Sequence, residues 1–142
     1  MHRQPTKRPK VPTRSVQSAQ GGNYLRKAEQ HLALALRAFA DNRWDSAVLL
    51  SVHAAISAAD AVCVSKHGLR SVSQSHADQV KLLRELFPED DGTVRATSQL
   101  AALIDRKNTV EYDARLCTQK DAEVAAKQAE RVVHWARTAL PK

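Results

Sequence analysis

The sequence contains few aromatic residues and only two cysteines, and each shortage excludes a class of protein. Phe, Trp and Tyr make up 4% of the 142 residues, too few rings for a base-stacking surface of the kind that binds single-stranded nucleic acids. Two cysteines do not form a disulfide framework. We therefore expect Cys63 and Cys117 to be free thiols in a reducing compartment.

An uninterrupted apolar run is also missing. The most apolar segment, residues 48–64, carries His53 and Asp60 in its middle, and ionisable groups at such positions argue against a membrane helix. No apolar stretch follows the basic N-terminus, so no secretory signal peptide is predicted. We expect a cytoplasmic protein with no membrane partner.

Acidic residues are absent from the first part of the chain. Lys and Arg outnumber Asp and Glu by 22 to 15, a formal net charge of +7, and five of these charges lie within residues 1–22. The rest of the chain is close to neutral, which excludes a protein that coats nucleic acid with a uniformly basic surface. We expect residues 1–22 to be a disordered basic tail, either a solvated arm or an arm that adds a salt-dependent affinity for phosphate.

Glycine and proline, both costly inside helices, are absent from residues 23–67, 69–87 and 93–140. Apolar residues recur there at spacings of three and four, and no alternating strand pattern of useful length is present. The predicted helices span about 24–40, 44–67, 76–87, 93–112 and 118–140. The sequence therefore predicts an all-α fold, an up-and-down bundle of four long helices and one short helix, in one domain over residues 23–140.

Particular residues predict where these helices begin and end. Asn23 is a candidate N-cap for the first helix, and Asp41 or Asn42 for the second. Gly68 is placed to end the second helix, which is apolar nearly all round and therefore central. Thr118, followed three residues later by an aspartate, resembles a capping box.

The predicted central helix carries one polar stripe. His53, Ser57 and Asp60 are spaced four and three residues apart, so they share one face, and polar groups on a buried face need partners. They form either a hydrogen-bonded core network or one wall of a polar cleft or dimer interface. The histidines show no metal-ligand spacing such as HxxxH or HxxE, so we expect no metal and no cofactor.

Residues 105–113, with the sequence DRKNTVEYD, gather charges and a tyrosine at the end of the fourth helix. One interpretation is a solvated helix end with an ordinary surface pair between Lys107 and Glu111. The other is a binding surface, because Arg offers a bidentate fork to phosphate and Tyr a face for stacking. Asn108 and Tyr112 share a face of this helix.

Taken in order, these features resemble the HEPN superfamily of small helical-bundle proteins. The resemblance covers residues 23–140. It rests on the turn at 42–45 that leads into Ser46-Ala47-Val48, on a loop with Gly68 and then His76, and on residues 106–113. The closing helix, with Ala122, Ala129 and Trp135, fits as well.

The resemblance also bears on activity. Ribonucleases of the family carry an Arg followed five positions later by a His, in a cleft shared by two subunits. Arg106 matches the Arg, but Glu111 stands at the position of the His. Members that lack the His and carry a Glu-Tyr or Asp-Tyr pair there are more similar to this chain, and they are often non-catalytic. Some are encoded beside small nucleotidyltransferases in toxin–antitoxin-like pairs.

We therefore expect a bacterial-type, HEPN-like homodimer that binds RNA, a nucleotide or a partner protein, such as a nucleotidyltransferase, in a toxin–antitoxin or defence system without catalysis. Arg106 would contact phosphate, Tyr112 would stack or offer its hydroxyl, and Asp60 and Glu111 would orient them. The predicted cleft consists of His53, Asp60, Arg106, Asn108, Glu111 and Tyr112.

Two alternatives remain open. One is a divergent metal-independent endoribonuclease in which Glu111 or His53 replaces the missing His. The other is a purely structural dimerisation module in which Arg106 and Glu111 only pair across the dimer.

Overall fold

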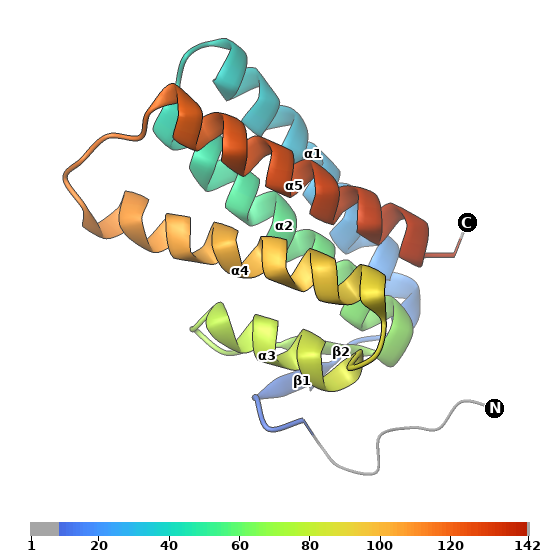
Figure 1. Cartoon of the computed structure of the whole chain (residues 1–142). Helices are drawn as coiled ribbons and strands as arrows, with labels where there is room; N and C mark the ends of the chain where they lie inside the picture. The colour runs from blue at the N-terminus through green and yellow to red at the C-terminus, as the bar shows by residue number, and fades with distance from the viewer. Residues whose placement is uncertain (1–8, 142) are drawn as a thin grey trace.

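The computed structural model describes residues 9–141, which form five helices and a small two-stranded sheet (Figure 1). The elements in chain order are β1 (Thr13–Ser15), the 3-10 turn η1 (Ser18–Gln20), α1 (Gly21–Ala40), α2 (Trp44–His67), β2 (Leu69–Ser71), α3 (Ala77–Leu86), α4 (Asp91–Tyr112) and α5 (Gln119–Ala139). The predicted all-α bundle of four long helices and one short helix is confirmed, with each predicted helix within a few residues of an observed one.

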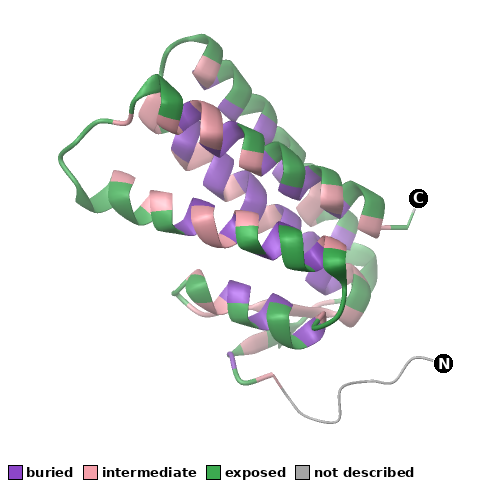
Figure 2. Cartoon of the chain, viewed as in Figure 1, coloured by how far each residue is buried: buried purple, intermediate pink, exposed green. Residues whose placement is uncertain are grey.

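Helix α2 is the centre of the bundle. It packs against α1, α4, α5 and α3, and α1 and α5 lie on one side of it while α4 and the short α3 lie on the other (Figure 1). Burial follows this arrangement, since the inner faces of the helices are buried and the outer faces are exposed (Figure 2). A helix enclosed on all sides needs apolar residues around most of its circumference, as the sequence predicted for α2.

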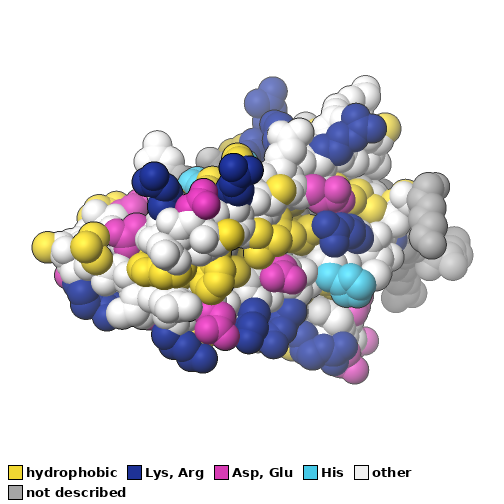
Figure 3. Space-filling model, turned by 90° about the horizontal axis from the view of Figure 1, so that it is seen from above, with side chains coloured by type: hydrophobic (Ala, Val, Ile, Leu, Met, Phe, Trp, Pro, Cys, Tyr) yellow, Lys and Arg dark blue, Asp and Glu magenta, His cyan; other side chains and the backbone are white. Residues whose placement is uncertain are grey.

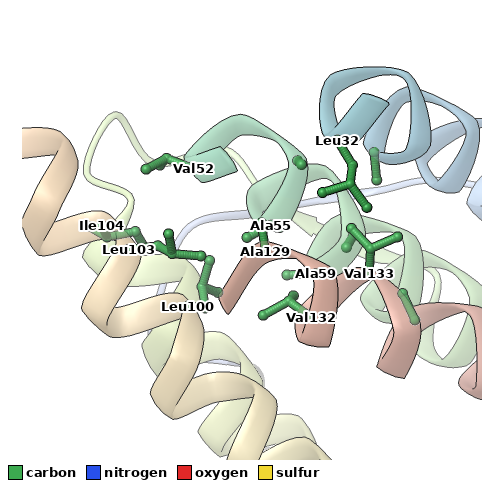
Figure 4. Close-up of a cluster of buried hydrophobic side chains, with 14 of the residues drawn as sticks. Leu32, Val52, Ala55, Ala59, Leu100, Leu103, Ile104, Ala129, Val132 and Val133 are labelled. Atoms are coloured by element: carbon green, nitrogen blue, oxygen red, sulfur yellow. The ribbon is translucent and has the colours of Figure 1, made fainter. Parts of the chain in front are cut away.

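Small side chains let the helices approach closely. Ala55 and Ala59 of α2 and Ala129 of α5 are fully buried, and they lie among the larger Leu and Val side chains of α1, α4 and α5 (Figure 4). At the start of α1, a Cβ placed on Gly21 would lie 2.9 Å from the Cβ of Ser65. Such close packing resembles a crystal of small molecules, so the positions of the helices are tightly specified.

Two predicted helix ends are confirmed. Gly68 ends α2 in the left-handed conformation, with φ of 64°, and its N–H donates to the Val64 carbonyl. Thr118 and Asp121 form a capping box at the start of α5, each side chain accepting from the other residue's backbone N–H. The glycine at the end of α2 and the reciprocal cap at the start of α5 both stabilise a helix end, because each provides partners for backbone groups that the end of a helix leaves unpaired.

Two predicted caps are wrong. Helix α1 begins at Gly21, so Asn23 lies inside its first turn and donates to the Gln20 side chain at 2.7 Å instead of capping the helix. Helix α2 has Arg43 at its N-cap without a side-chain bond, and Asn42 takes up a left-handed turn conformation with φ of 60°. Asn tolerates that conformation better than most residues, which explains its place in the turn.

The segment before α1 is structured where it is described, contrary to the expectation of a disordered tail over residues 1–22. Strand β1 pairs antiparallel with β2, with Arg14 opposite Arg70, and η1 and the first two residues of α1 follow it. Val11 is buried in the core with 7% of its surface exposed. An apolar anchor and backbone pairing hold this segment to the bundle. Residues 1–8 lie outside the described residues.

Helix α2 is long and apolar enough to cross a membrane by length and composition alone. In the structure, 72% of its most apolar window is buried inside the protein. That burial is typical of the core helix of a soluble protein, because the packing of neighbouring helices replaces the need for lipid.

Replacing Val11 by Ala should test whether the first strand is anchored to the core. Removal of two buried methyl groups should lower the free energy of unfolding by about 1.5–3 kcal/mol. Val72→Ala is the matched control, because Val72 follows β2 and has 47% of its surface exposed. Urea denaturation measures both variants, and equal losses would contradict the anchoring of this segment.

Candidate functional site

The inward face of α4 is apolar over much of its length and becomes charged near its C-terminal end. Leu100, Leu103 and Ile104 are buried against the core, and Lys107 and Glu111 continue the same stripe at spacings of three and four. Only 14% of the Lys107 side chain is exposed, and its Nζ lies 2.9 Å from the Glu111 carboxylate. The sequence had offered this pair as an ordinary surface pair; in the structure most of the Lys107 side chain is covered, while Glu111 stays exposed.

Two histidines face this polar end of α4, and a third lies beside one of them. His53 of α2 lies beside His31 of α1, with 5.9 Å between the ring centroids, and His53 interacts electrostatically with His76, Lys107 and Glu111. His76 stands at the N-cap of α3 and also interacts with both α4 residues. We call His31, His53, His76, Lys107 and Glu111 the histidine cluster.

The surroundings keep two of these imidazoles neutral. Burial lowers the pKa of His53 from its ordinary value, and His31, Lys107 and His76 lower it further, while Glu111 opposes them. Burial and Lys107 lower the pKa of His76, and Glu111 again opposes them. Because the ordinary value lies near 6.5, both rings are neutral at pH 7. A neutral imidazole offers one donor and one acceptor nitrogen.

Asp60 lies apart from the histidine cluster, about 10 Å further along α2 than His53. It is buried, and its carboxylate accepts hydrogen bonds from Arg70 Nε at 3.1 Å and from Gln79 Nε2 at 2.8 Å. Burial raises the pKa of Asp60, and Arg70 and Gln79 oppose that rise. The arrangement ties α2 to β2 and α3, so Asp60 belongs to a hydrogen-bonded core network.

Arg106 points toward the start of α5. Its Nη1 lies 3.8 Å from Asp121 Oδ1, at the limit of an ion pair, and 33% of its side chain is exposed. The Asp121 carboxylate already accepts from the Thr118 backbone N–H at 2.9 Å, and that hydrogen bond lowers the pKa of Asp121. The guanidinium of Arg106 is therefore held loosely by a carboxylate that serves mainly as a helix cap.

Asn108 and Tyr112 share a shallow depression at the end of α4. The depression is lined by these two residues and by Thr109, Asp113 and Ala114. Tyr112 has 84% of its surface exposed. The loop that follows extends away from the bundle before the chain returns to α5 (Figure 1), so this end of α4 is uncovered in the described chain.

The six residues predicted to form one cleft thus lie in different surroundings. His53 and Glu111 share the histidine cluster, Asn108 and Tyr112 share the exposed depression, Arg106 faces α5, and Asp60 lies in the core network. Sequence analysis missed the roles of His31, His76 and Lys107. For Lys107 a signal existed, because it continues the spacing of the buried leucines of α4; for the two histidines, which lie far apart in the sequence, no local signal existed.

Neither a metal nor a reactive thiol is evident among residues 9–141. No group of three or more His, Cys, Asp or Glu side chains there is placed to hold a metal ion. Cys63 and Cys117 are both free. Burial raises the pKa of the Cys63 thiol, and burial with Asp45 raises the pKa of Cys117 to about 12. A thiol that stays protonated at pH 7 is a poor nucleophile.

Replacing Asp60 by Ala should destabilise the protein without touching the histidine cluster. The change leaves Arg70 without its ion pair and removes one acceptor from the buried Gln79 amide, which should lower the free energy of unfolding by about 2–3 kcal/mol. Arg37→Ala is the control, because it breaks a pair with Asp41 in which 80% of the Arg37 side chain is exposed. Thermal or urea unfolding reports both, and an Asp60→Ala protein as stable as the control would argue against a core network.

The comparisons with known proteins agree with the helical architecture. The family model described as HEPN domain matches residues 22–139, which span α2 to α5 and nearly all of α1. No curated protein matches the chain. Since the match covers most of the sequence, the chain belongs to the HEPN domain family.

Proposed function

We propose that this HEPN protein is a non-catalytic RNA-binding component of a toxin–antitoxin or defence system, and that RNA binds at the exposed end of α4. The observation that carries the proposal is the Tyr112 ring, 84% exposed beside Asn108 in a shallow depression. An exposed ring beside an amide offers stacking and hydrogen bonding to one unpaired base. The low aromatic content fits such a single contact and not an extended stacking platform.

Arg106 supplies a phosphate contact for this proposal. Its side chain is a third exposed, and its ion pair with Asp121 is long at 3.8 Å, so its N–H groups can turn to an RNA phosphate. A bidentate arginine contact fixes the position of a phosphate more firmly than a lysine does.

The residue at position 111 supports binding without cleavage. Glu111 replaces the histidine of the family's ribonucleases, and its carboxylate is engaged by Lys107 Nζ at 2.9 Å. An ionised carboxylate only accepts hydrogen bonds, whereas an imidazole offers one donor and one acceptor nitrogen for acid–base work.

Variants of the α4 end should separate RNA binding from the rest of the fold. Tyr112→Ala should weaken binding of a labelled single-stranded RNA roughly tenfold, the loss expected for one base stack, and Arg106→Ala should weaken it by a similar factor. Arg95→Ala is the matched control, because Arg95 is exposed near the other end of the same helix. Fluorescence anisotropy in the presence of EDTA measures the affinities. Equal affinities for all three variants and the unchanged protein would refute the proposed surface.

A metal-independent ribonuclease is the second candidate, favoured by the neutral imidazole of His53 beside Glu111 in the histidine cluster. The same EDTA-containing reactions, run on a denaturing gel, distinguish the two functions. RNA that stays intact supports binding alone. Cleavage that is lost in His53→Gln and retained in His134→Gln, an exposed histidine on α5, would establish the second candidate instead.

A homodimer is part of the proposal, with the second copy covering the loop after α4. Leu116 in this loop has 74% of its surface exposed, and apolar side chains gather at this end of the molecule and across the face over α1 and α5 (Figure 3). Exposed apolar surface of this kind is typical of interfaces. The proposed cleft shared by two subunits would then lie beside Tyr112.

Replacing Leu116 by Asp should therefore produce a monomer. Sedimentation velocity at high micromolar concentration should give the mass of two chains for the unchanged protein and one chain for Leu116→Asp, because a buried unpaired carboxylate is costly at an interface. Val94→Asp, which changes a 49% exposed valine on α4, should remain dimeric. A monomer mass for the unchanged protein would overturn the proposed assembly.

A further inference from the structure

Strands β1 and β2 form a ribbon whose hydrogen-bonding pattern is fixed at both ends. Val16 N–H donates at 2.9 Å to the carbonyl of the residue before β2, and Val72 N–H donates at 3.1 Å to the carbonyl of the residue before β1. Hydrogen-bonded pairs recur at every second position of an antiparallel ladder. Arg14 and Arg70, which are directly opposite each other, are therefore the pair that exchanges backbone hydrogen bonds in the middle of the ribbon.

The residues on either side of Arg14 point their backbone groups away from β2. In such a ladder, the N–H and C=O groups of Thr13 and Ser15 lie on the outer edge of β1, and these groups make no hydrogen bond within residues 9–141. Ser15 is exposed, and β1 lies at the margin of the molecule (Figure 1). An exposed row of unpaired N–H and C=O groups is a template on which an extended segment of another chain can pair.

Positive charge accompanies this open edge. Arg14 and Arg70 are directly opposite each other, so their side chains lie on the same face of the ribbon. Arg14 is exposed and makes no ion pair within residues 9–141. Like charges directly opposite in a ladder destabilise it, and an anionic side chain added beside Arg14 would offset that repulsion.

Tyr24 holds two more groups of this face in place. Arg70 Nε donates to the buried Asp60 carboxylate at 3.1 Å, and the guanidinium carbon lies 5.3 Å from the centre of the Tyr24 ring. Lys27 Nζ lies 5.3 Å from the centre of the same ring, and 41% of the Arg70 side chain is exposed. Cations held in this way lose little freedom on binding. Since two cations already lie over the ring, it is a poorer stacking surface for a base than Tyr112.

We propose that an extended acidic segment of a partner protein adds as a third strand to the outer edge of β1. Its backbone pairs with Thr13 and Ser15, and an Asp or Glu between these two pairs lies directly opposite Arg14, on the face that carries Arg70. A second copy of this chain fits poorly, because two β1 strands paired in this way bring Arg14 against its own copy. Strand β1 precedes residues 22–139, which the HEPN model matches.

Amide hydrogen exchange in the full-length protein tests strand addition directly. The probe is a capped peptide of about nine residues in which glutamate alternates with valine, and the control peptide has the same composition with its glutamates in one block. The alternating peptide should bind saturably and slow exchange at the Thr13 and Ser15 amides, because these N–H groups gain carbonyl partners. The Arg14 amide, already paired within the ribbon, should change little. The blocked peptide should bind roughly tenfold more weakly, since it cannot place its acids on one face.

Matched variants assign the binding to the edge. Ser15→Pro removes an outward N–H at a position where an edge strand tolerates proline, and it should weaken peptide binding roughly tenfold, whereas Ser15→Ala keeps the N–H and should bind as the unchanged protein does. Arg14→Ala should weaken binding roughly fivefold, the effect of one cross-strand ion pair. Arg95→Ala removes the same charge from an exposed position on α4 and should have no effect. Arg14→Ala remains a test if circular dichroism shows that Ser15→Pro unfolds the protein.

Competition and concentration identify the occupant. Tyr112→Ala should bind the peptide unchanged, because the loop after α4 contacts the start of α2 whereas β2 follows its end. A single-stranded RNA that displaces the peptide would make the edge a nucleic-acid surface and overturn the acidic segment. Slowed exchange at Thr13 and Ser15 with rising protein concentration alone would assign the edge to a second copy instead. Equal binding of both peptides, unchanged exchange at these two amides, or equal affinities of Arg14→Ala and Arg95→Ala would overturn strand addition itself.

Discussion

The close packing of α2 against four other helices is the constraint on which the rest of the structure depends. Fully buried alanines such as Ala55 and Ala59 bring the neighbouring helices close, and at Gly21 not even a Cβ has room beside Ser65. Because the interior is this dense, an ionisable side chain on α2 is stable either in a satisfied network or where the neighbouring helices leave the surface open. A small hydroxyl is less restricted, since Ser51 is buried without a hydrogen-bond partner among the described residues.

The polar stripe of α2 shows both outcomes. Near its end, β2 and α3 bring Arg70 and Gln79 onto Asp60, and the carboxylate becomes part of the core. Two turns earlier, His53 is only partly covered and faces the polar end of α4. One stripe thus stabilises the fold at one end and offers titratable groups at the other. The difference arises from the neighbouring elements and not from the stripe itself.

This division explains what the sequence could predict. Helix positions follow from apolar spacing and from Gly68 and Thr118, whose roles are local. Strands of three residues are too short to show alternation, and the burial of Val11 depends on packing against a bundle formed much later in the chain. Lys107 and Glu111 have the same spacing whether the pair is exposed or enclosed, so only the tertiary structure shows that Lys107 is enclosed.

The grouping of the candidate site residues could not be predicted for the same reason. The six predicted residues come from two helices, and the sequence alone does not show which faces of those helices meet. Arg106 and Lys107 are adjacent in the sequence, yet one contacts α5 and the other lies against α2 and α3, because successive helical residues point about 100° apart. Predicting the histidine cluster required His31 and His76, which join it only through the packing of α1 and α3.

Glu111 connects the departure from the family's ribonucleases to the charge of the cluster. Its carboxylate is the counter-charge of Lys107, whose side chain is 14% exposed. A histidine at position 111 would leave that ammonium near His53 and His76 without its carboxylate partner, and each proton bound there would then add repulsion. The glutamate and Lys107 therefore form one unit. Acid–base cleavage near neutral pH is suited to an imidazole, and the position that the family's ribonucleases give to that imidazole is occupied here by the carboxylate partner of Lys107.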